Sequence, residues 1–563
     1  MNEVRFDYVV IGAGTAGALM ANRLSADTQR RVLLIEAGGK DDYLWIRIPV
    51  GYLYCIGNPR TDWLYNTEPE PGLNGRVLRY PRGKTLGGCT SINGMIYMRG
   101  QSRDYDQWAQ LTGDPTWCWD NVLPAFRQHE DHWRGDAGQT PDAQFAQFHG
   151  HAGEWRVEKQ RLQWDILNAF AAAAVQAGIA HTEDFNRGNN EGVGYFEVNQ
   201  KSGWRWNSAR AFLRPACTGR PNFTQWTHAQ VTRLLIARDD RGALRCTGAQ
   251  VCNGSERISV HAQCEVLLCA GSIGSPQLLQ LSGIGPGALL REHGIQVCAD
   301  LPGVGQNLQD HLQIRSVYKI SGARTLNTLA HSLWGKVSIG LEYALRRSGP
   351  MSMSPSQLGA FTRSSPEHLW PNIEYHVQPL SLDAFGEPLH RFPAFTASVC
   401  NLNPSSRGTV RIRSPRHEDA PAIALNYLST AEDRKVAADS LRVTRHIAAQ
   451  RALAPYHPEE WKPGAQYQSD EDLTRLAGDI GSTIFHPVGT TKMGRDDDPL
   501  AVLDTRLRVR DGRGGLIAGL RVVDGGAMPT ITSGNTCSPV LMIAEKAAAW
   551  VRENATKSIS SRG

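Results

Sequence analysis

The chain has 563 residues and a mass of 61.9 kDa, which at roughly 150 residues per domain suggests three or four domains. Its 41% hydrophobic and 20% charged residues exclude a disordered or fibrous protein, and a net charge of +5 is too small for a nucleic-acid binder of this size. Glycine is abundant at 56 residues, against a usual share of about 7%. We therefore expect long stretches of backbone in conformations that require glycine.

Cysteine usage and hydropathy indicate the compartment. The eleven cysteines form no CxxC pair and no cluster with zinc spacing, so we expect reduced thiols, a cytoplasmic protein and no metal site. The first residues lead directly into a strand, without the features of a signal peptide. No apolar run reaches the eighteen or so residues of a spanning helix. The amphipathic, basic segment 329–347 is interpreted as a surface helix packed on the core, with peripheral membrane contact as the alternative.

A nucleotide-binding pattern opens the chain. Residues 6–11 (FDYVVI) predict a buried strand, GAGTAG follows at 12–17, and residues 18–24 are helical in pattern. Gly12 permits the tight turn, Gly14 lets the backbone approach a pyrophosphate, and Gly17 lets the helix pack against the strand. A second strand at 31–35 ends in Glu36, whose carboxylate suits ribose hydroxyls and repels a 2′-phosphate. These features predict a dinucleotide site that disfavours NADP.

Two further glycine-rich segments extend this pattern. Residues 82–95 form a Gly/Ser/Thr-rich loop with a basic start, which continues into the apolar residues 96–98 as a loop lying along a ligand would. Residues 265–269 predict a second apolar strand, followed by a glycine turn and a helix at 277–281. By themselves these patterns do not separate FAD from NAD.

The longer motifs resemble those of the glucose–methanol–choline (GMC) flavin oxidoreductases. Four blocks carry this resemblance in order: RGKTLGGCTSINGMIYMRG (82–100), GSIGSPQLLQLSGIG (271–285), HPVGTTKMG (486–494) and LRVVDGGAMPTITSGNTCSP (520–539). The likeness covers nearly the whole chain and is strongest to bacterial choline-dehydrogenase-like and aliphatic or aryl alcohol-oxidising members. Cys89 and Gly525-Gly526 depart from the family pattern; we expect little loss from the small Cys89 and mainly added flexibility from the glycine pair.

The resemblance implies FAD and assigns residues to it. Gly12, Gly14, Thr15 and Ala16 would hold the pyrophosphate, Glu36 the adenosine ribose and Val231 the adenine edge. The flavin side would be lined by Leu86, Gly88, Asn93, Gly94, Met95 and Ile96, and the ribityl chain and ring would meet Asp524, Gly525 and Thr536. Members with covalent flavin use a histidine in the first signature. Ser91-Ile92-Asn93 contains none, so we predict non-covalent FAD.

Alcohol oxidation needs a group that takes the hydroxyl proton while the hydride passes to flavin N5. Imidazole suits this role because its pKa lies near neutrality. On the fragment alone His486 reads as a structural histidine, but the resemblance makes it the general base and Asn535 its catalytic partner. His311 is interpreted as structural, with a hydrogen bond between the domains. Cys400 resembles the cysteine of a decarboxylase branch, a role that the presence of His486 and Asn535 argues against.

The substrate prediction depends on one residue at which this chain departs from the pattern of its choline-oxidising relatives. Choline-oxidising relatives carry a glutamate two residues after the Asp-His pair, where this chain has Gln313. A neutral amide cannot offset a buried trimethylammonium, so we expect a neutral, fairly apolar primary alcohol, aliphatic or aromatic, that is oxidised to the aldehyde. The electron acceptor is quinone or O2, with a dehydrogenase favoured over an oxidase. A redox-idle hydroxynitrile lyase and a non-catalytic flavin-binding protein are the remaining alternatives.

The predicted architecture is α/β, with a Rossmann-like FAD-binding domain and a second α+β substrate-binding domain built on an antiparallel sheet. The FAD-binding domain takes residues 1–155, 203–310 and 478–563, and the substrate-binding domain takes 156–202 and 311–477. The alternating run 408–413 (GTVRIR) is assigned to the antiparallel sheet. The active site is expected between the two domains.

Overall fold

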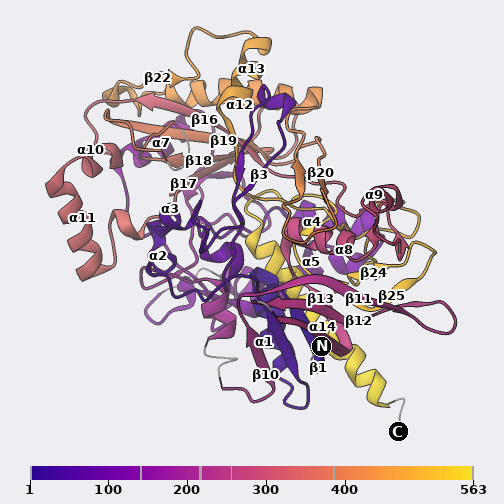
Figure 1. The fold of residues 1–563 in the computed structure, drawn as a ribbon. Helices are drawn as coiled ribbons and strands as arrows, with labels where there is room; N and C mark the ends of the chain where they lie inside the picture. The colour runs from indigo at the N-terminus through magenta and orange to yellow at the C-terminus, as the bar shows by residue number, and fades with distance from the viewer. Residues whose placement is uncertain (1–2, 140–142, 215–218, 255, 384–386, 561–563) are drawn as a thin grey trace.

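The computed structural model describes residues 3–139, 143–214, 219–254, 256–383 and 387–560. Within them lie two large sheets, one mostly parallel and one antiparallel (Figure 1). This is the predicted combination of a Rossmann-like α/β unit and an α+β unit.

The first sheet has eight strands in the order β10-β2-β1-β13-β12-β25-β24, with β11 beside β12. Its parallel centre consists of β10 (Phe223–Trp226), β2 (Val32–Ile35), β1 (Glu3–Ile11), β13 (Glu256–Leu268) and β25 (Leu516–Val522). Antiparallel pairs join β12 (Leu244–Asn253) to β11 (Ala229–Arg238) and to β13, and β24 (Arg508–Arg510) to β25. Segments from both ends of the chain therefore share this sheet.

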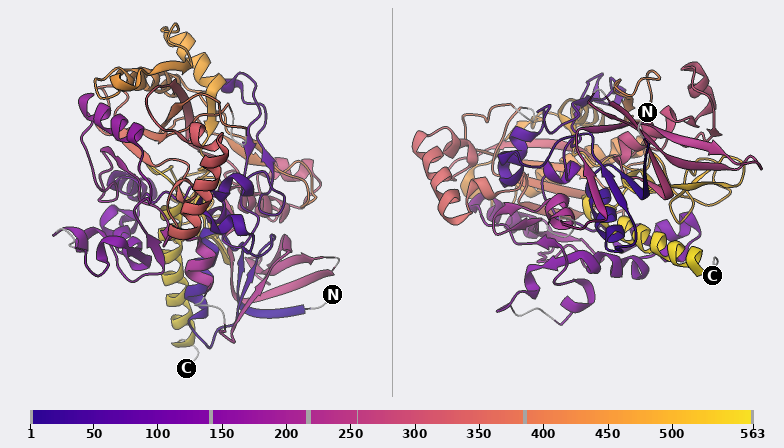
Figure 2. Two further views of the ribbon diagram at one scale, coloured as in Figure 1. Left: turned by 90° about the vertical axis from the view of Figure 1, so that its left-hand side faces the viewer. Right: turned by 60° about the horizontal axis from the view of Figure 1, so that its bottom comes forward.

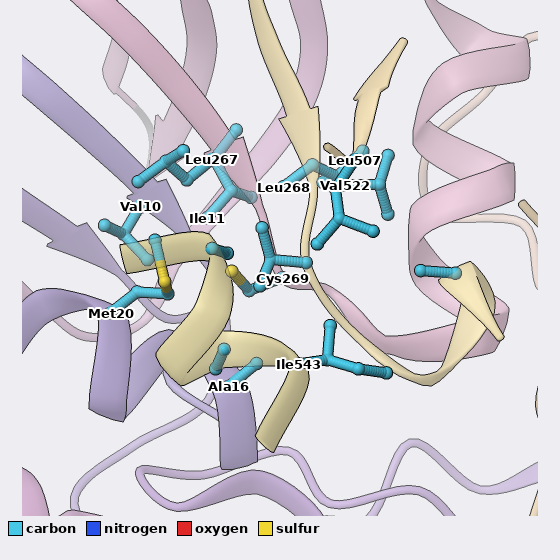
Figure 3. Close-up of a cluster of buried hydrophobic side chains, with 14 of the residues drawn as sticks. Val10, Ile11, Ala16, Met20, Leu267, Leu268, Cys269, Leu507, Val522 and Ile543 are labelled. Atoms are coloured by element: carbon cyan, nitrogen blue, oxygen red, sulfur yellow. The ribbon is translucent and has the colours of Figure 1, made fainter. Parts of the chain in front are cut away.

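Two helices from opposite ends of the chain pack together against this sheet. Helix α1 (Thr15–Ser25) follows the glycine turn, and α14 (Cys537–Ser560) runs beside it (Figure 2). Their apolar side chains meet the ends of β1 and β13 in the core around Cys269 (Figure 3). Met20 and Ile543 are fully buried there, so this contact fixes the start of α14 relative to the glycine turn.

The second sheet has seven antiparallel strands in the order β22-β16-β19-β18-β17-β7, with β23 beside β16. They are β22 (Glu459–Lys462), β16 (Leu312–Lys319), β19 (Ala394–Asn401), β18 (Ile373–Gln378), β17 (Leu358–Thr362), β7 (Gly192–Tyr195) and β23 (Gly481–Thr483). One face packs on α7 (Asp165–Gln176), α12 (Ala431–Ala448) and α13 (Asp470–Ile480). Because strand side chains alternate, the opposite face is free to line a site.

Shorter elements connect these units. The helices are α2 (Leu44–Arg47), α3 (Tyr52–Cys55), α4 (Ser102–Thr112), α5 (Trp119–His129), α6 (Phe145–Phe148), α8 (Gly271–Leu281) and α9 (Gly287–Glu292). The strands are β3 (Tyr65–Asn66), β4 (Arg79–Tyr80), β5 (Glu130–His132), β6 (Trp155–Val157), β8 (Gln200–Lys201), β9 (Trp204–Arg205), β14 (Ile284–Gly285) and β15 (Ala299–Asp300).

Two details of the predicted architecture differ from the structure. The run at 408–413 forms β20 (Thr409–Arg411), which pairs with β21 (Ala422–Ala424) in a separate two-stranded ladder. Backbone bonds from Gly408 to Leu308 and from Val410 to Gly305 hold it away from the large antiparallel sheet. In addition, Tyr65 and Tyr80 were assigned to the FAD-binding domain, yet both pack in the core of the second sheet.

The amphipathic segment forms α10 (Leu326–Ala330) and α11 (Leu333–Arg346), which protrude at the left of Figure 1. The expectation that this segment packs on the core is wrong for α11. Tyr343 is its one buried residue, whereas Leu333 and Trp334 are 81% and 84% exposed. Among the described residues, no helix is both long and apolar enough to cross a bilayer.

Candidate active site

A cavity lies between the carboxyl ends of the parallel strands and the open face of the second sheet. Its wall includes nearly all of the residues assigned from the sequence: Gly12, Gly14, Thr15, Ala16, Glu36, Gly88, Asn93, Gly94, Met95, Ile96, Val231, His486, Asp524, Gly525, Asn535 and Thr536. The structure therefore brings together positions from Gly12 to Thr536, nearly the whole length of the chain.

Leu86 is the exception. Its side chain is 3% exposed and belongs to the apolar core of the first sheet, not to the cavity wall. Its amide donates to the carbonyl of Gly39, and the chain then reverses at Gly87, whose φ is +86°. This turn directs Leu86 inward and presents Gly88 to the cavity in its place, so the assignment of Leu86 to the flavin side is wrong for its side chain.

One end of the cavity has the shape of a dinucleotide cradle. Helix α1 begins at Thr15, and its N-cap Gly14 provides no side-chain cap, so the first amides of the helix are available to a ligand. Gly88 approaches this turn so closely that a Cβ built on it would lie 2.7 Å from the Gly14 Cα. Any larger side chain would close the gap between the two loops. These bare amides and the space above them fit a pyrophosphate.

Glu36 stands at the end of β2 with its carboxylate directed at the turn. Oε2 accepts from the Ala13 amide at 2.9 Å, and Oε1 accepts from the Gly38 amide at 2.8 Å. Burial raises the pKa of Glu36 to about 7, opposed by these two bonds and by Lys84. A ribose hydroxyl that donates to this carboxylate would favour its ionised form.

Asp524 connects two segments that border the middle of the cavity. Oδ2 accepts from the Gly271 amide at 2.9 Å and from the Ser275 hydroxyl at 2.6 Å, while Oδ1 accepts from the Gly526 amide at 2.8 Å. The carboxylate thus fixes the start of α8 against the turn at 525–527. Burial raises its pKa, and its protein donors oppose that shift.

His486 and Asn535 meet at the other end of the cavity, and a chain of hydrogen bonds defines the tautomer of His486. His311 Nε2 lies 3.0 Å from the Leu402 carbonyl, which can only accept, so this nitrogen carries a proton. Neutral His311 then accepts at Nδ1, and His486 Nδ1, 3.1 Å away, must donate. His486 Nε2 then carries no proton, and its lone pair accepts from the Asn535 amide nitrogen at 3.1 Å. The nitrogen facing the cavity is therefore the basic one.

The surroundings of His486 keep it neutral. Burial lowers the pKa of His486 well below its usual value of 6.5, and His311, His376 and Arg82 lower it further. Asn535 Oδ1 is buried without a partner among the described residues. An unprotonated imidazole and an unused amide oxygen therefore border the same space.

Asp310 positions both histidines. Its Oδ1 accepts from the backbone amides of His311 and His486 at 2.9 and 2.7 Å. Its Oδ2 accepts from Tyr80, Tyr427 and Thr483 at 3.0, 2.5 and 2.6 Å. Five donors on one buried carboxylate hold the β16 and β23 ends together. The sequence does not reveal this role of Asp310, because its side-chain donors come from distant segments.

The second sheet contributes cavity residues that the sequence analysis did not assign. Besides Gln313, which it discussed, Arg315 on β16 and His376 and Gln378 on β18 line the wall. Arg315 follows Gln313 by two residues and so lies on the same face of the strand. This spacing of two residues is the feature of the sequence from which Arg315 could have been assigned to the cavity wall. Cys400 is buried on β19 and does not line the cavity.

Comparison with known proteins agrees with this arrangement. Family models of the GMC oxidoreductases match residues 6–313 and 404–544. The chain is 38% identical over 544 residues to an alcohol dehydrogenase [acceptor] of Pseudomonas putida, covering 96% of this chain and 95% of that one. It is 39% identical over 557 residues to an oxygen-dependent choline dehydrogenase of Burkholderia lata, covering 98% and 94%.

A solved structure of the Aspergillus oryzae formate oxidase, in a variant made to study FAD modification, superposes with a TM-score of 0.89. It shares 25% identity and covers 99% of this chain and all of that one. The chain belongs to the GMC oxidoreductase family and is an oxidoreductase.

Proposed function

We propose that this protein oxidises a primary alcohol to the aldehyde with non-covalent FAD, with His486 as the base. The observation that carries the proposal is the unprotonated Nε2 of a neutral, buried His486, which accepts from the Asn535 amide at one end of a cavity whose other end fits a dinucleotide. The names of the relatives, an alcohol dehydrogenase and a choline dehydrogenase, agree with an alcohol as the reacting group.

The residues divide the chemistry between them. His486 Nε2 takes the hydroxyl proton, and the Asn535 amide donates to the substrate oxygen and holds it beside the imidazole. FAD, when bound, supplies the hydride acceptor. As its ring gains the proton, His486 keeps its Nδ1 donor on His311, so the imidazolium needs no rearrangement. The products are the aldehyde, a protonated His486 and a reduced cofactor, which balances the two electrons removed.

The cradle residues would hold FAD. The amides at 14–16 would meet the pyrophosphate, Glu36 the adenosine ribose and Val231 the adenine edge. Residues 93–96 with Gly88 would border the flavin, and Asp524, Gly525 and Thr536 the ribityl chain. The segment 91–93 offers no histidine for a covalent link. Acid precipitation should therefore release all of the flavin into the supernatant, and flavin that stays with the pellet would contradict non-covalent binding.

Anaerobic reduction tests the reaction directly. A panel of aliphatic and aromatic primary alcohols should bleach the flavin absorbance of the holoenzyme. His486→Ala should retain bound FAD and slow bleaching by about 1,000-fold, within the range expected for loss of a general base. A holoenzyme that no alcohol reduces would sink the redox proposal and favour the hydroxynitrile lyase alternative, which release of cyanide from mandelonitrile would then establish.

We further propose that the enzyme is a dehydrogenase that passes electrons to a quinone. The support is the acceptor-dependent relative at 38% identity together with the exposed helix α11. With an active alcohol, turnover should be at least about tenfold faster with a soluble quinone than with air-saturated buffer. Stoichiometric oxygen consumption at the full turnover rate, measured with an oxygen electrode, would make the protein an oxidase instead.

Helix α11 is proposed as a peripheral contact with an anionic bilayer. Leu333, Val337, Leu341 and Leu345 repeat every four residues and form one exposed apolar stripe, with Trp334 next to it. Lys336 and Arg346 are exposed on the same helix and complement acidic headgroups. The basic residues, together with the apolar stripe, are the reason for proposing an anionic bilayer as the partner of α11.

A further inference from the structure

A row of polar side chains crosses the cavity face of the second sheet. On β19, Cys400 lies opposite Gln313 and Ser398 lies opposite Arg315. One strand further, on β18, Glu374 lies opposite Cys400 and His376 lies opposite Ser398. The alternate residues of the same strands, such as Ile314 and Tyr375, point into the apolar core behind the sheet. Of this row, Gln313, Arg315 and His376 line the cavity, and these side chains are the ones that can meet the rest of the substrate.

Arg315 stands out in this row because it has no counter-ion. The described residues give it one hydrogen bond, from Nη2 to Gln378 Oε1 at 3.4 Å, and no carboxylate within ion-pair distance. Burial lowers the pKa of Arg315 to about 10, with Tyr52 opposing the shift, so the guanidinium remains charged at neutral pH.

Two other buried arginines have carboxylate partners, whereas buried Arg205 has none among the described residues and donates instead to backbone carbonyls, including that of Asn93. Arg99 lies 2.8 Å from Glu130, and Arg521 lies 2.6 Å from Glu265. An unpaired cation in the wall of a cavity is unfavourable unless a bound ligand supplies the opposite charge. The guanidinium fork presents parallel N–H groups that match a carboxylate.

We propose that Arg315 binds a carboxylate at the far end of the alcohol, so that the substrate is a hydroxy acid. This inference rests on the proposed alcohol oxidation and names the substrate class of the same cavity. Gln378 places its Oε1 beside the guanidinium, and Gln313 lies two residues before Arg315 on the same face of β16, so both amides border the space that a carboxylate would enter. A single guanidinium matches the single charge of a carboxylate better than the double charge of a phosphate.

The position of Arg315 also limits the length of the substrate. Gln313 donates to the Thr483 carbonyl at 3.3 Å, three residues before His486. Arg315 lies two residues further along the strand, a rise of about 7 Å. The hydroxyl at His486 and the carboxylate at Arg315 are therefore separated by several bonds, and a two-carbon hydroxy acid such as glycolate is too short.

The proposed carboxylate changes the predicted charge of the substrate. Gln313 argued against a cationic substrate and was taken to favour a wholly neutral one. The same argument extends to Arg315, because a trimethylammonium would meet a like charge in the wall. The apolar body of the alcohol is retained and gains an anionic end.

The test compares matched substrates on the holoenzyme. A series of ω-hydroxy acids of increasing length and 4-(hydroxymethyl)benzoate are each paired with the corresponding amide, and kcat/KM is measured for both. Wild type should prefer the acid over the amide. In Arg315→Met the acid-to-amide ratio should fall by about 100-fold, and Arg315→Lys should retain part of it. Arg475→Met on the exposed face of α13 should leave the ratio unchanged.

Binding without turnover supplies a second measurement. Alkanoates that lack the hydroxyl should perturb the flavin absorption spectrum of wild type, and their Kd should rise by about 100-fold in Arg315→Met, while the Kd of the matching amides changes less. If amides and acids reduce the flavin equally well in wild type and the ratio is the same in Arg315→Met, the carboxylate site is refuted and alcohol oxidation stands. If no alcohol of either kind reduces the flavin, alcohol oxidation itself fails.

Discussion

His486 is neutral because its surroundings disfavour a positive charge. Its pKa is lowered by burial and by its neighbours, so the group loses its proton below the usual value of 6.5. The base form is active, and kcat/KM for an alcohol should therefore be constant above pH 6.5 and decline only at lower pH. A pH profile measured by flavin reduction checks this. An acid limb centred above pH 7 would contradict the lowered pKa.

The same shift affects stability. In the unfolded chain a histidine takes up its proton near pH 6.5, whereas folded His486 does so only at lower pH. Between these values the unfolded state binds more protons, so the contribution of His486 makes the folded protein less stable as pH falls below about 6.5. Denaturant titrations of wild type and His486→Gln at pH 7.5 and 5.5 should show a smaller loss of stability in the variant.

His311 acts on the substrate only through His486. His311→Leu removes the acceptor for His486 Nδ1 and frees the imidazole to adopt the other tautomer, which should lower kcat by roughly 10- to 100-fold. Because His311 also lowers the pKa of His486, the acid limb should move to higher pH. His311→Gln keeps an acceptor oxygen and should recover part of kcat. An unchanged pH profile in the leucine variant would show that His311 is a packing residue alone.

The placement of site residues was predictable from the sequence where it depends on local patterns, while the roles of these residues stay predictions. The glycine turn, Glu36 at the strand end, and the His486 and Asn535 motifs all line the cavity as expected. The Asp310 network was not predictable, since its donors Tyr80, Tyr427 and Thr483 come from three distant segments. The missing partner of Arg315 likewise depends on which side chains the fold brings near it.

At the scale of elements, the cradle depends on the distance between two loops. Gly88→Ala would place a Cβ 2.7 Å from the Gly14 Cα, and relieving this contact would require the backbone of one loop to move. The variant should bind FAD at least about tenfold more weakly, as measured by equilibrium dialysis of the apoprotein. Gly57 also has a positive φ but open space around it, so Gly57→Ala carries the backbone strain without the collision. Equal losses in both variants would show that strain, and not the gap, sets the affinity.

Sequence patterns indicated whether a segment is a strand or a helix, but not which other element it packs against. The alternating run at 409–411 is a strand, but alternation alone does not reveal which sheet it joins. The stripe on α11 is helical, yet an apolar stripe does not show what covers it. Both differences arise because the decisive contacts lie far away in sequence, with Gly305 and Leu308 holding β20 in its place.

For the molecule as a whole, the proposed bilayer contact of α11 would decide whether it stays in bulk solvent. Wild type should sediment with vesicles that contain anionic phosphatidylglycerol, less so with neutral ones, and salt should weaken the association. Leu333→Ser with Trp334→Ser should lower the partition coefficient by at least about tenfold, because two large apolar groups no longer enter the headgroup region. Leu369→Ser, at another site with 81% exposure, is the matched control. If both variants sediment like wild type, α11 is not the contact.

The sheet order has a consequence for how the protein is made. Strand β25 pairs with β13, and α14 packs on α1, although each follows its partner by hundreds of residues. Both His486 and Asn535 belong to the same late part of the chain. During synthesis the first half therefore leaves the ribosome with an open sheet edge and an uncovered α1. The cofactor cleft closes only after α14 has emerged, so cofactor capture comes at the end of translation, and a chaperone has a long interval in which to protect the exposed strand.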